Sequence, residues 1–281
     1  MNQITILDHG YISLIETWGS DERIIEAARM STAKGFQGWG DSCPSCKGSR
    51  VETMRIWDEA PQQVFYATGK MRLVGGKYHE IQVVCSLCGG SSNPPGDEKL
   101  LRYLWEHKHA TPFEMAGAIF EIQAPIFVFR EWHRHRTQSY NEMSARYTPL
   151  PNVNYIPTID RLLVNSKSNR QAGVISGAEE LNEAKAGSYL AELKMEYDSQ
   201  EQLYQIALSI GIPKELARIH LPVGRYSRMR ASANLRNWLA FLTLRMDQAA
   251  QWEIRQYANA ACNLLASIFP RTVALFLEGM K

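Results

Sequence analysis

A polar stretch in the middle of the chain, residues 130–147, most constrains how this sequence can fold. It carries four arginines and two histidines among serine, asparagine, glutamate and tyrosine, and no apolar period runs through residues 134–147. Such a stretch cannot form an ordinary core element. Arginine forks beside hydroxyl and amide groups favour a phosphate-bearing ligand, because they present several fixed donors to its oxygens. A solvated basic loop or an RNA-binding patch is the alternative, but such patches seldom interleave short polar and acidic residues so closely.

The composition is that of a globular protein. The chain has 281 residues, of which 45% are hydrophobic and 21% charged, so it can bury a sizeable core in one large domain or two. A net charge of +2 is too small to argue for binding to nucleic acid or to a membrane. No apolar run is long enough to span a bilayer, and the N-terminus lacks the pattern of a signal peptide. We therefore expect a cytoplasmic protein with no membrane partner.

Four of the five cysteines form two Cys-x-x-Cys pairs, each followed closely by glycine. The cysteines are Cys43, Cys46, Cys85, Cys88 and Cys262. Two such knuckles supply the four thiolates of a tetrahedral zinc site, so residues 34–96 are predicted to be a zinc-ribbon-like segment with one structural zinc. A redox-active thiol set, or two pairs without a ligand, remains open. Cys262 lies in a helical run and is expected to be a small buried hydrophobe without a catalytic role.

Short β-like runs are expected between the two cysteine pairs, over 51–57, 64–68, 70–74 and 77–84. Gly75-Gly76 indicates a hairpin turn between the last two runs. Outside this segment, the pattern predicts strands over 3–7, 11–17 and 116–123. It predicts helices over 20–28, 97–108, 179–211 and 214–220, and a helical C-terminal region.

The polar stretch resembles the signature of a known family. The run Arg134-His135-Arg136, followed by Ser139, Asn141, Glu142, Ser144, Arg146 and Tyr147, fits the pattern RHRxxSxNExSxRY of flavin-dependent thymidylate synthases at every fixed position. Three other segments are similar to family motifs: His109 to Glu114, Arg218 to Pro222, and Leu244 to Arg255. The resemblance implies an α+β fold with an antiparallel sheet packed against long helices, formed by residues 1–33 and 97–281, with 34–96 as an insertion.

The resemblance also assigns site residues. The flavin is expected to contact Ser31, His109, Thr111, Glu114, Arg134, His135, Arg136, Asn234 and Arg236. The nucleotide is expected to contact Glu131, Arg134, Glu142, Ser144, Arg146, Arg218 and Arg245. Taken alone, His109 would be a cation at a helix C-terminus and Arg218 a salt bridge at a helix end. The chain departs from the family at Glu131, where glutamine is usual, and at Ala240 and Ala249, where some relatives carry asparagine and histidine.

By this resemblance, NADPH reduces bound FAD, and methylenetetrahydrofolate gives a one-carbon unit to C5 of dUMP, which becomes dTMP. The resemblance implies that Arg245 is the catalytic residue, because a guanidinium that stays protonated can stabilise negative charge on the pyrimidine ring but cannot act as a general base. The family also implies a homotetramer with active sites at subunit interfaces. One alternative is a hydroxymethylase or a methylase of another pyrimidine nucleotide, because of Glu131 and the insertion. A remote alternative is a nucleic-acid-binding zinc-ribbon protein on a degenerate scaffold.

Overall fold

The computed structural model describes residues 2–39, 51–59, 62–65, 71–74, 77–84, 96–164 and 173–280. The chain divides into two compact units. The larger unit combines Met1–Ile24 with His109–Lys281, and the smaller unit is Ile25–Lys108. The smaller unit extends beyond the predicted insertion at both ends. None of the described helices is long and apolar enough to cross a membrane.

A five-stranded antiparallel sheet organises the larger unit, with the strand order β1-β2-β7-β9-β8. The strands are β1 (Gln3–Ile6), β2 (Gly10–Trp18), β7 (Gly117–Pro125), β8 (Ser139–Glu142) and β9 (Tyr226–Asn234). Strand β9 was not predicted from the sequence, although Met229, Ala231 and Ala233 alternate with more exposed polar residues along it. Strand β8, which lies within the polar stretch and pairs with β9, was also not predicted.

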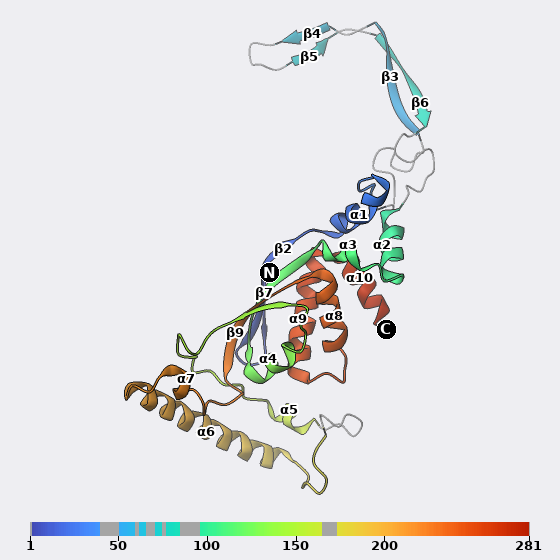
Figure 1. The fold of residues 1–281 in the computed structure, drawn as a ribbon. Helices are drawn as coiled ribbons and strands as arrows, with labels where there is room; N and C mark the ends of the chain where they lie inside the picture. The colour runs from blue at the N-terminus through green and yellow to red at the C-terminus, as the bar shows by residue number, and fades with distance from the viewer. Residues whose placement is uncertain are drawn as a thin grey trace. The chain divides into compact units, whose positions relative to one another are not determined.

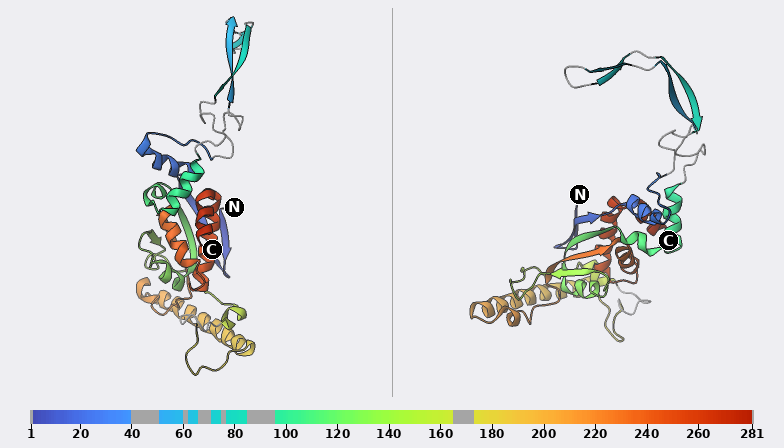
Figure 2. Two further views of the ribbon diagram at one scale, coloured as in Figure 1. Left: turned by 90° about the vertical axis from the view of Figure 1, so that its right-hand side faces the viewer. Right: turned by 45° about the horizontal axis from the view of Figure 1, so that its top comes forward.

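Helices α8 (Leu235–Arg245) and α9 (Trp252–Ile268) lie alongside each other against this sheet, and α10 (Pro270–Gly279) packs on α9 (Figure 1; Figure 2). Their buried side chains form the core with the strands: Trp132 stacks on Phe241, with ring centroids 4.6 Å apart, and Phe120 meets Trp238 edge to face. Cys262 is buried in α9, as predicted. An antiparallel sheet packed with helices confirms the predicted α+β class.

The remaining helices of this unit are α3 (Ala110–Glu114), α4 (Ile126–Trp132), α5 (Ile159–Leu163), α6 (Glu183–Ser209) and α7 (Lys214–Ala217). Helix α6 begins four residues later than predicted because the Asn182 side chain caps it, accepting from the Lys185 amide at 2.9 Å. Helix α7 is shorter than the predicted 214–220. From Arg218 the backbone forms single turns instead, with Ile219 donating to the Leu216 carbonyl and Leu221 to the Arg218 carbonyl.

The smaller unit contains most of α1 (Asp21–Arg29), followed by a 3-10 turn over Met30–Thr32, the strands β3 (Val51–Glu59), β4 (Gln62–Phe65), β5 (Met71–Val74) and β6 (Lys77–Val84), and helix α2 (Asp97–Glu106). The predicted hairpin across Gly75-Gly76 is wrong. Strand β5 pairs with β4, and β6 pairs with β3, each antiparallel. A glycine pair permits a turn but does not select the partner strand, and here the eight residues of β6 run along β3 while the four of β5 run along β4.

Candidate functional site

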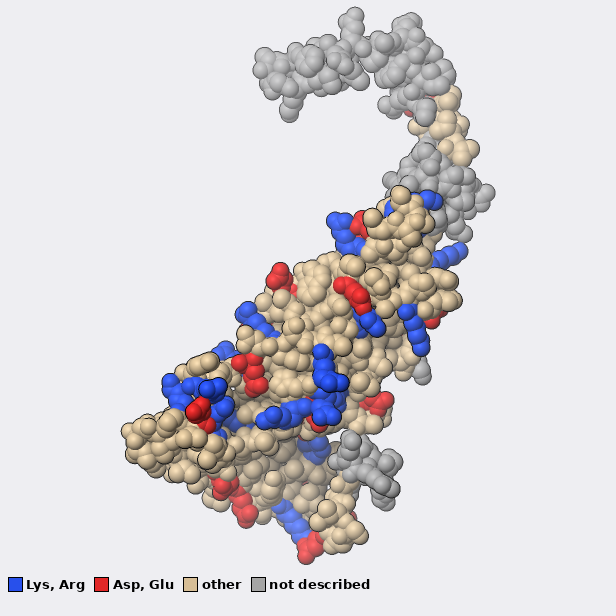
Figure 3. All heavy atoms as spheres, viewed as in Figure 1, with Lys and Arg blue, Asp and Glu red and all other residues tan. Residues whose placement is uncertain are grey.

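Helix α4 carries the first part of the site. It starts directly after Pro125, whose missing N–H costs nothing there, and it buries Val128, Phe129 and Trp132 against the core. The opposite side of α4 and the turn that follows border a cavity of about 700 Å³. Its lining residues are Arg130, Glu131, His133, Arg134 and Arg245. Figure 3 shows Lys and Arg side chains grouped over α4 and the end of α8, with a carboxylate among them.

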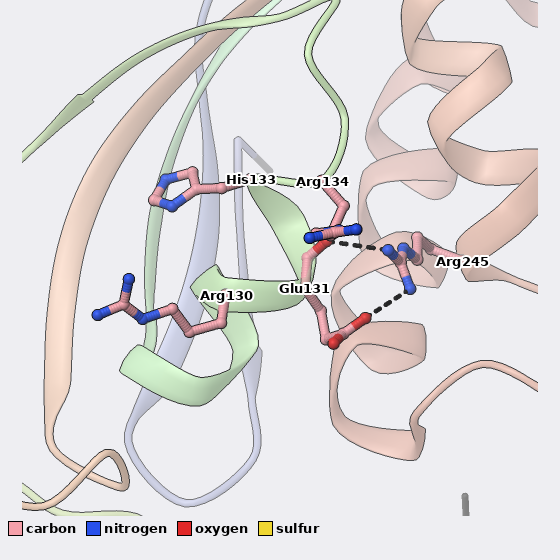
Figure 4. A pocket seen from close by; sticks show the side chains of 5 residues that line it. All are labelled: Arg130, Glu131, His133, Arg134 and Arg245. Carbon is pink, nitrogen blue, oxygen red and sulfur yellow. Dashed lines mark hydrogen bonds and ion pairs between the residues drawn. The ribbon is translucent and has the colours of Figure 1, made fainter.

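Arg245 reaches this cavity from the last turn of α8, where a positive charge suits the helix dipole. Three of its N–H groups are held by the polar stretch. Nη1 donates to Glu131 Oε2 at 3.0 Å, and Nη2 donates to the Glu131 backbone carbonyl at 2.9 Å (Figure 4). Nε donates to His135 Nε2 at 2.8 Å. The guanidinium is therefore fixed in orientation by partners more than 100 positions earlier in the chain.

The hydrogen bond from Arg245 determines which ring nitrogen of His135 carries the proton. Because Nε2 accepts a hydrogen bond from Arg245, the ring proton of the neutral imidazole must reside on Nδ1. Burial, followed by the nearby charge of Arg245, lowers the pKa of His135 to about 4, although Glu131 opposes the shift. His135 is thus neutral at physiological pH and supports Arg245 as a hydrogen-bond acceptor.

Side chains within the polar stretch hold its loop in shape. Trp132 Nε1 donates to Gln138 Oε1 at 3.0 Å, and the Tyr140 hydroxyl donates to the His135 carbonyl at 2.6 Å. Burial raises the pKa of Tyr140 to about 12, so its hydroxyl remains a donor. Asn237 of α8 also donates to the Thr137 carbonyl at 2.9 Å. These hydrogen bonds stabilise a loop whose sequence has no regular apolar residues to pack into the core.

A second cavity, of about 190 Å³, borders the other side of Arg130 and His133. Its lining residues are Ile126, Phe129, Arg130, His133, Glu142, Met143 and Arg218. Arg130 and His133 therefore line both cavities, although neither was singled out as a site residue from the sequence. Their position in the sequence directly beside Glu131 and Arg134 could have indicated that they belong to the site.

Two later residues of the signature, Ser144 and Arg146, make contacts away from the two lining sets. Arg146 Nε donates to Glu215 Oε2 of α7 at 3.1 Å, and both side chains are more than half exposed. The Ser144 hydroxyl accepts from the Arg146 backbone amide at 3.3 Å. Neither residue lines either of the two cavities around α4. Their expected contacts to the nucleotide stay predictions.

Several residues predicted to contact flavin make hydrogen bonds within the chain. Asn234 caps α8, its side-chain oxygen accepting from the Asn237 amide at 3.0 Å. Arg236 donates to Glu114 at 2.6 Å. His109 is the residue before α3, and Thr111 lies within that helix. Ser31 lies in the smaller unit, where its hydroxyl donates to the Ala28 carbonyl at 3.1 Å.

The predicted zinc ligands lie outside the described residues. These are Cys43, Cys46, Cys85 and Cys88. Over the described ranges, no three histidine, cysteine, aspartate or glutamate side chains come together in a way that could hold a metal ion. Strands β3 and β6 pair so that Val51 lies opposite Val84. These are the strand ends that are nearest in sequence to the two cysteine pairs, and they lie side by side.

Comparison with known proteins gives consistent matches. The family described as "Thymidylate synthase complementing protein" matches residues 13–271. A protein of Thermosipho africanus named flavin-dependent thymidylate synthase is 36% identical over 97% of this chain and 93% of its own. A protein of the same name from Kosmotoga olearia is 32% identical over 98% of this chain and 94% of its own length. Among solved structures, a UMP/dUMP methylase, PolB, from Streptomyces cacaoi bound with 5-Br UMP is similar with a TM-score of 0.67 and 25% identity, over 98% of this chain and 96% of that one.

Proposed function

The chain belongs to the family of flavin-dependent thymidylate synthases, methyltransferases that convert dUMP to dTMP, and from this premise we propose that the cavities around α4 bind the pyrimidine nucleotide. The observation that carries the proposal is the fixed guanidinium of Arg245 at one cavity and a second arginine, Arg218, at the other. Arg130 lines both and connects the two ends. The ring would lie toward Arg245 and the phosphate toward Arg218.

The balance of charge supports this orientation. Glu131 neutralises Arg245, whereas Arg130, Arg134 and Arg218 make no ion pair with any residue that the structure describes. In the smaller cavity, Arg130 and Arg218 face one carboxylate, Glu142. A phosphate monoester would supply the missing negative charge, and guanidinium forks bind its oxygens with several donors at once.

Arg245 would activate the ring. Negative charge that develops at N3 and O2 of uracil increases the nucleophilicity of C5, and a fixed donor stabilises that charge without having to reorganise. The three hydrogen bonds to Glu131 and His135 provide this fixed orientation. Arginine stays protonated, so the proposed role is electrostatic.

The residues expected to hold the flavin fit an anionic cofactor. Arg134 and Arg136 are exposed and make no ion pair within the described ranges, so their donors are available to a pyrophosphate. Asn234 and Arg236 begin helix α8 on the same unit. When bound, FAD supplies the redox chemistry, with NADPH as reductant and methylenetetrahydrofolate as the one-carbon donor.

One alternative substrate has a specific observation behind it. The structurally similar PolB is described as a methylase of both UMP and dUMP. The ribonucleotide UMP is therefore the second substrate to test, by product mass after incubation with each nucleotide.

Three further features remain proposals. A homotetramer is supported by exposed apolar side chains at the end of α6 and directly after it, among them Leu203, Ile206 and Ile210. A monomer in light scattering that still holds flavin tightly would contradict it. A structural zinc on the two cysteine pairs is supported by their spacing and by the paired ends of β3 and β6. A cytoplasmic location is expected from the sequence alone.

The nucleotide orientation is tested with two ligands and three variants. Arg130→Gln and Arg218→Gln should each weaken dUMP binding to the flavin-loaded protein by roughly 10- to 100-fold, as expected for a lost hydrogen bond to a charged group. Deoxyuridine, which lacks the phosphate, should bind the variants and the parent protein equally. Arg230→Gln is the matched control, because Arg230 pairs with Glu121 on the sheet and lines neither cavity. Equal losses for dUMP and deoxyuridine would place the phosphate elsewhere.

A further inference from the structure

A buried arginine that the proposed mechanism does not use lies close in sequence to Arg218. The side chain of Arg225, directly before β9, is 1% exposed. Its Nη2 lies 2.7 Å from Glu201 Oε2 of α6, and its Nη1 donates to Asn152 Oδ1 at 3.0 Å. Nη2 also donates to the Leu150 carbonyl at 3.3 Å. Arg225 therefore joins the start of β9 to α6 and to the loop before α5.

Stability alone is a weak explanation for this ion pair. Two charges removed from water cost free energy, and a buried pair often stabilises a protein no more than well-packed apolar side chains do. The pair is also incompletely satisfied, because Arg225 Nε is buried without a hydrogen-bond partner among the described residues. What Arg225 adds is a set of directed bonds that fix the backbone on which it lies.

That backbone leads directly to Arg218 through two consecutive turns. The Arg225 amide donates to the Pro222 carbonyl at 3.0 Å, and the Leu221 amide donates to the Arg218 carbonyl at 3.1 Å. The path between the two arginines is thus short and hydrogen-bonded. A shift of Arg225 would be passed on to Arg218, which lines the smaller cavity.

Helix α6 also supports the residues on either side of Arg218. Ala217 forms a buried cluster with Tyr204 and Ala207 of α6, and Leu221 packs against this cluster. Arg218 is therefore held between an apolar contact with α6 on one side and, beyond the two turns, the ion pair of Arg225 with α6.

The same segment supports the start of α4 with its backbone carbonyls. The Arg225 carbonyl accepts from the Ile126 amide at 2.9 Å, and the Val223 carbonyl accepts from the Phe127 amide at 3.0 Å. These amides belong to the first two residues of α4, which have no acceptor within the helix. Helix α4 in turn places Arg130 at the smaller cavity. The segment before β9 thus supports both arginines that line this cavity.

We propose that Arg225 and Glu201 are positioning residues that hold Arg218 at the separation from Arg130 that a phosphate monoester requires. This inference rests on the proposed function, since it requires the phosphate to lie in the smaller cavity. Neither Arg225 nor Glu201 lines either cavity around α4, so both act through Arg218.

The experiment measures binding of dUMP and of deoxyuridine to the flavin-loaded protein, together with thermal unfolding. The double variant Glu201→Met/Arg225→Met replaces both charges with apolar side chains, so its melting temperature should stay within a few degrees of the parent value. Its affinity for dUMP should fall roughly tenfold, as for one weakened hydrogen bond to a charged group. Its affinity for deoxyuridine, which lacks the phosphate, should not change.

Arg225→Lys separates the charge from the directed bonds. Lysine keeps a positive charge opposite Glu201, but it lacks the fork that reaches Asn152 and the Leu150 carbonyl together. It should show the same selective loss of dUMP affinity. This variant decides the question if the double variant does not fold.

A double-mutant cycle tests whether Arg225 acts through Arg218. In an Arg218→Gln background, where the phosphate contact is already lost, Arg225→Lys should reduce dUMP affinity by no more than about twofold further. Arg161→Met is the matched control, because it breaks another partly buried ion pair of the same unit, to Glu253, and Arg161 lines neither cavity. It should lower the melting temperature without changing dUMP affinity.

Four results would contradict the account. Parent-level dUMP affinity in either the folded double variant or Arg225→Lys would overturn the inference, since the pair would then serve stability alone. An equal loss for dUMP and deoxyuridine would overturn it as well, and so would a full tenfold loss from Arg225→Lys in the Arg218→Gln background. If Arg218→Gln by itself binds dUMP as tightly as the parent protein, the proposed function fails first, because the phosphate then lies elsewhere.

Discussion

Replacement of Arg245 separates its proposed catalytic effect from its structural effect. Arg245→Ala removes the ion pair to Glu131 and the hydrogen bonds to the Glu131 carbonyl and to His135. The ion pair is partly exposed on the Glu131 side, so its loss costs up to about 1 kcal/mol, and each hydrogen bond contributes about 1 kcal/mol. We therefore expect a loss of roughly 1–3 kcal/mol in the free energy of unfolding.

The expected effect on turnover is larger than this. Loss of one preorganised donor to a developing negative charge typically lowers kcat by about 10²–10³, or about 2.7–4 kcal/mol. The loss should persist at saturating dUMP, because the interaction strengthens as charge develops on the ring. Arg245→Lys keeps the positive charge but cannot form the three directed bonds of the fork, so its turnover should fall between those of Arg245→Ala and the parent protein.

The assay is dTMP formation at saturating dUMP, with flavin absorbance and thermal unfolding measured on the same samples. Flavin content should remain at the level of the parent protein, and the melting temperature should fall by only a few degrees. Unchanged turnover in Arg245→Ala would remove Arg245 from the mechanism. A loss of turnover that follows a loss of flavin would show that its role is structural.

Three further perturbations test other parts of the account. The folded-state pKa of His135, about 4, lies below the unfolded value of 6.5, so the unfolded chain binds the proton first and the free energy of unfolding should fall as the pH drops through this range. In urea unfolding, His135→Gln should lose less of this free energy between pH 7 and pH 5 than the parent protein. An equal loss would contradict the assignment. Asn234→Ser retains a helix cap and should keep the melting temperature while flavin is released, whereas Asn234→Ala should lose about 1 kcal/mol as well; retention of flavin in both variants would exclude Asn234 as a ligand. Cys85→Ser should abolish binding of one zinc per chain and increase proteolysis within residues 34–96 without loss of flavin, measured by elemental analysis and limited digestion; zinc content equal to that of the parent protein would refute the ligand assignment.

Some of the fold could be predicted from local pattern. Strands β1, β2 and β7 and helices α1 and α2 were expected within a few residues of their observed bounds, because apolar periodicity and capping residues act over short distances. Strand β9 was missed because the side chains on its buried face are mostly small, so its alternation is weak. The pairing of β5 with β4 was missed because a glycine pair permits a turn but does not select the partner strand.

For the site, the sequence by itself determined which chemical groups are available and predicted their ligand, and the tertiary structure decided the contacts. The arginines, histidines and acids of residues 130–147 indicated a phosphate-bearing ligand before any fold was known. No local period could predict that Glu131 and His135 hold Arg245, because they lie 114 and 110 positions before it in the chain. They meet because α8 and α4 both pack against the same sheet, and that packing is set by the whole buried core.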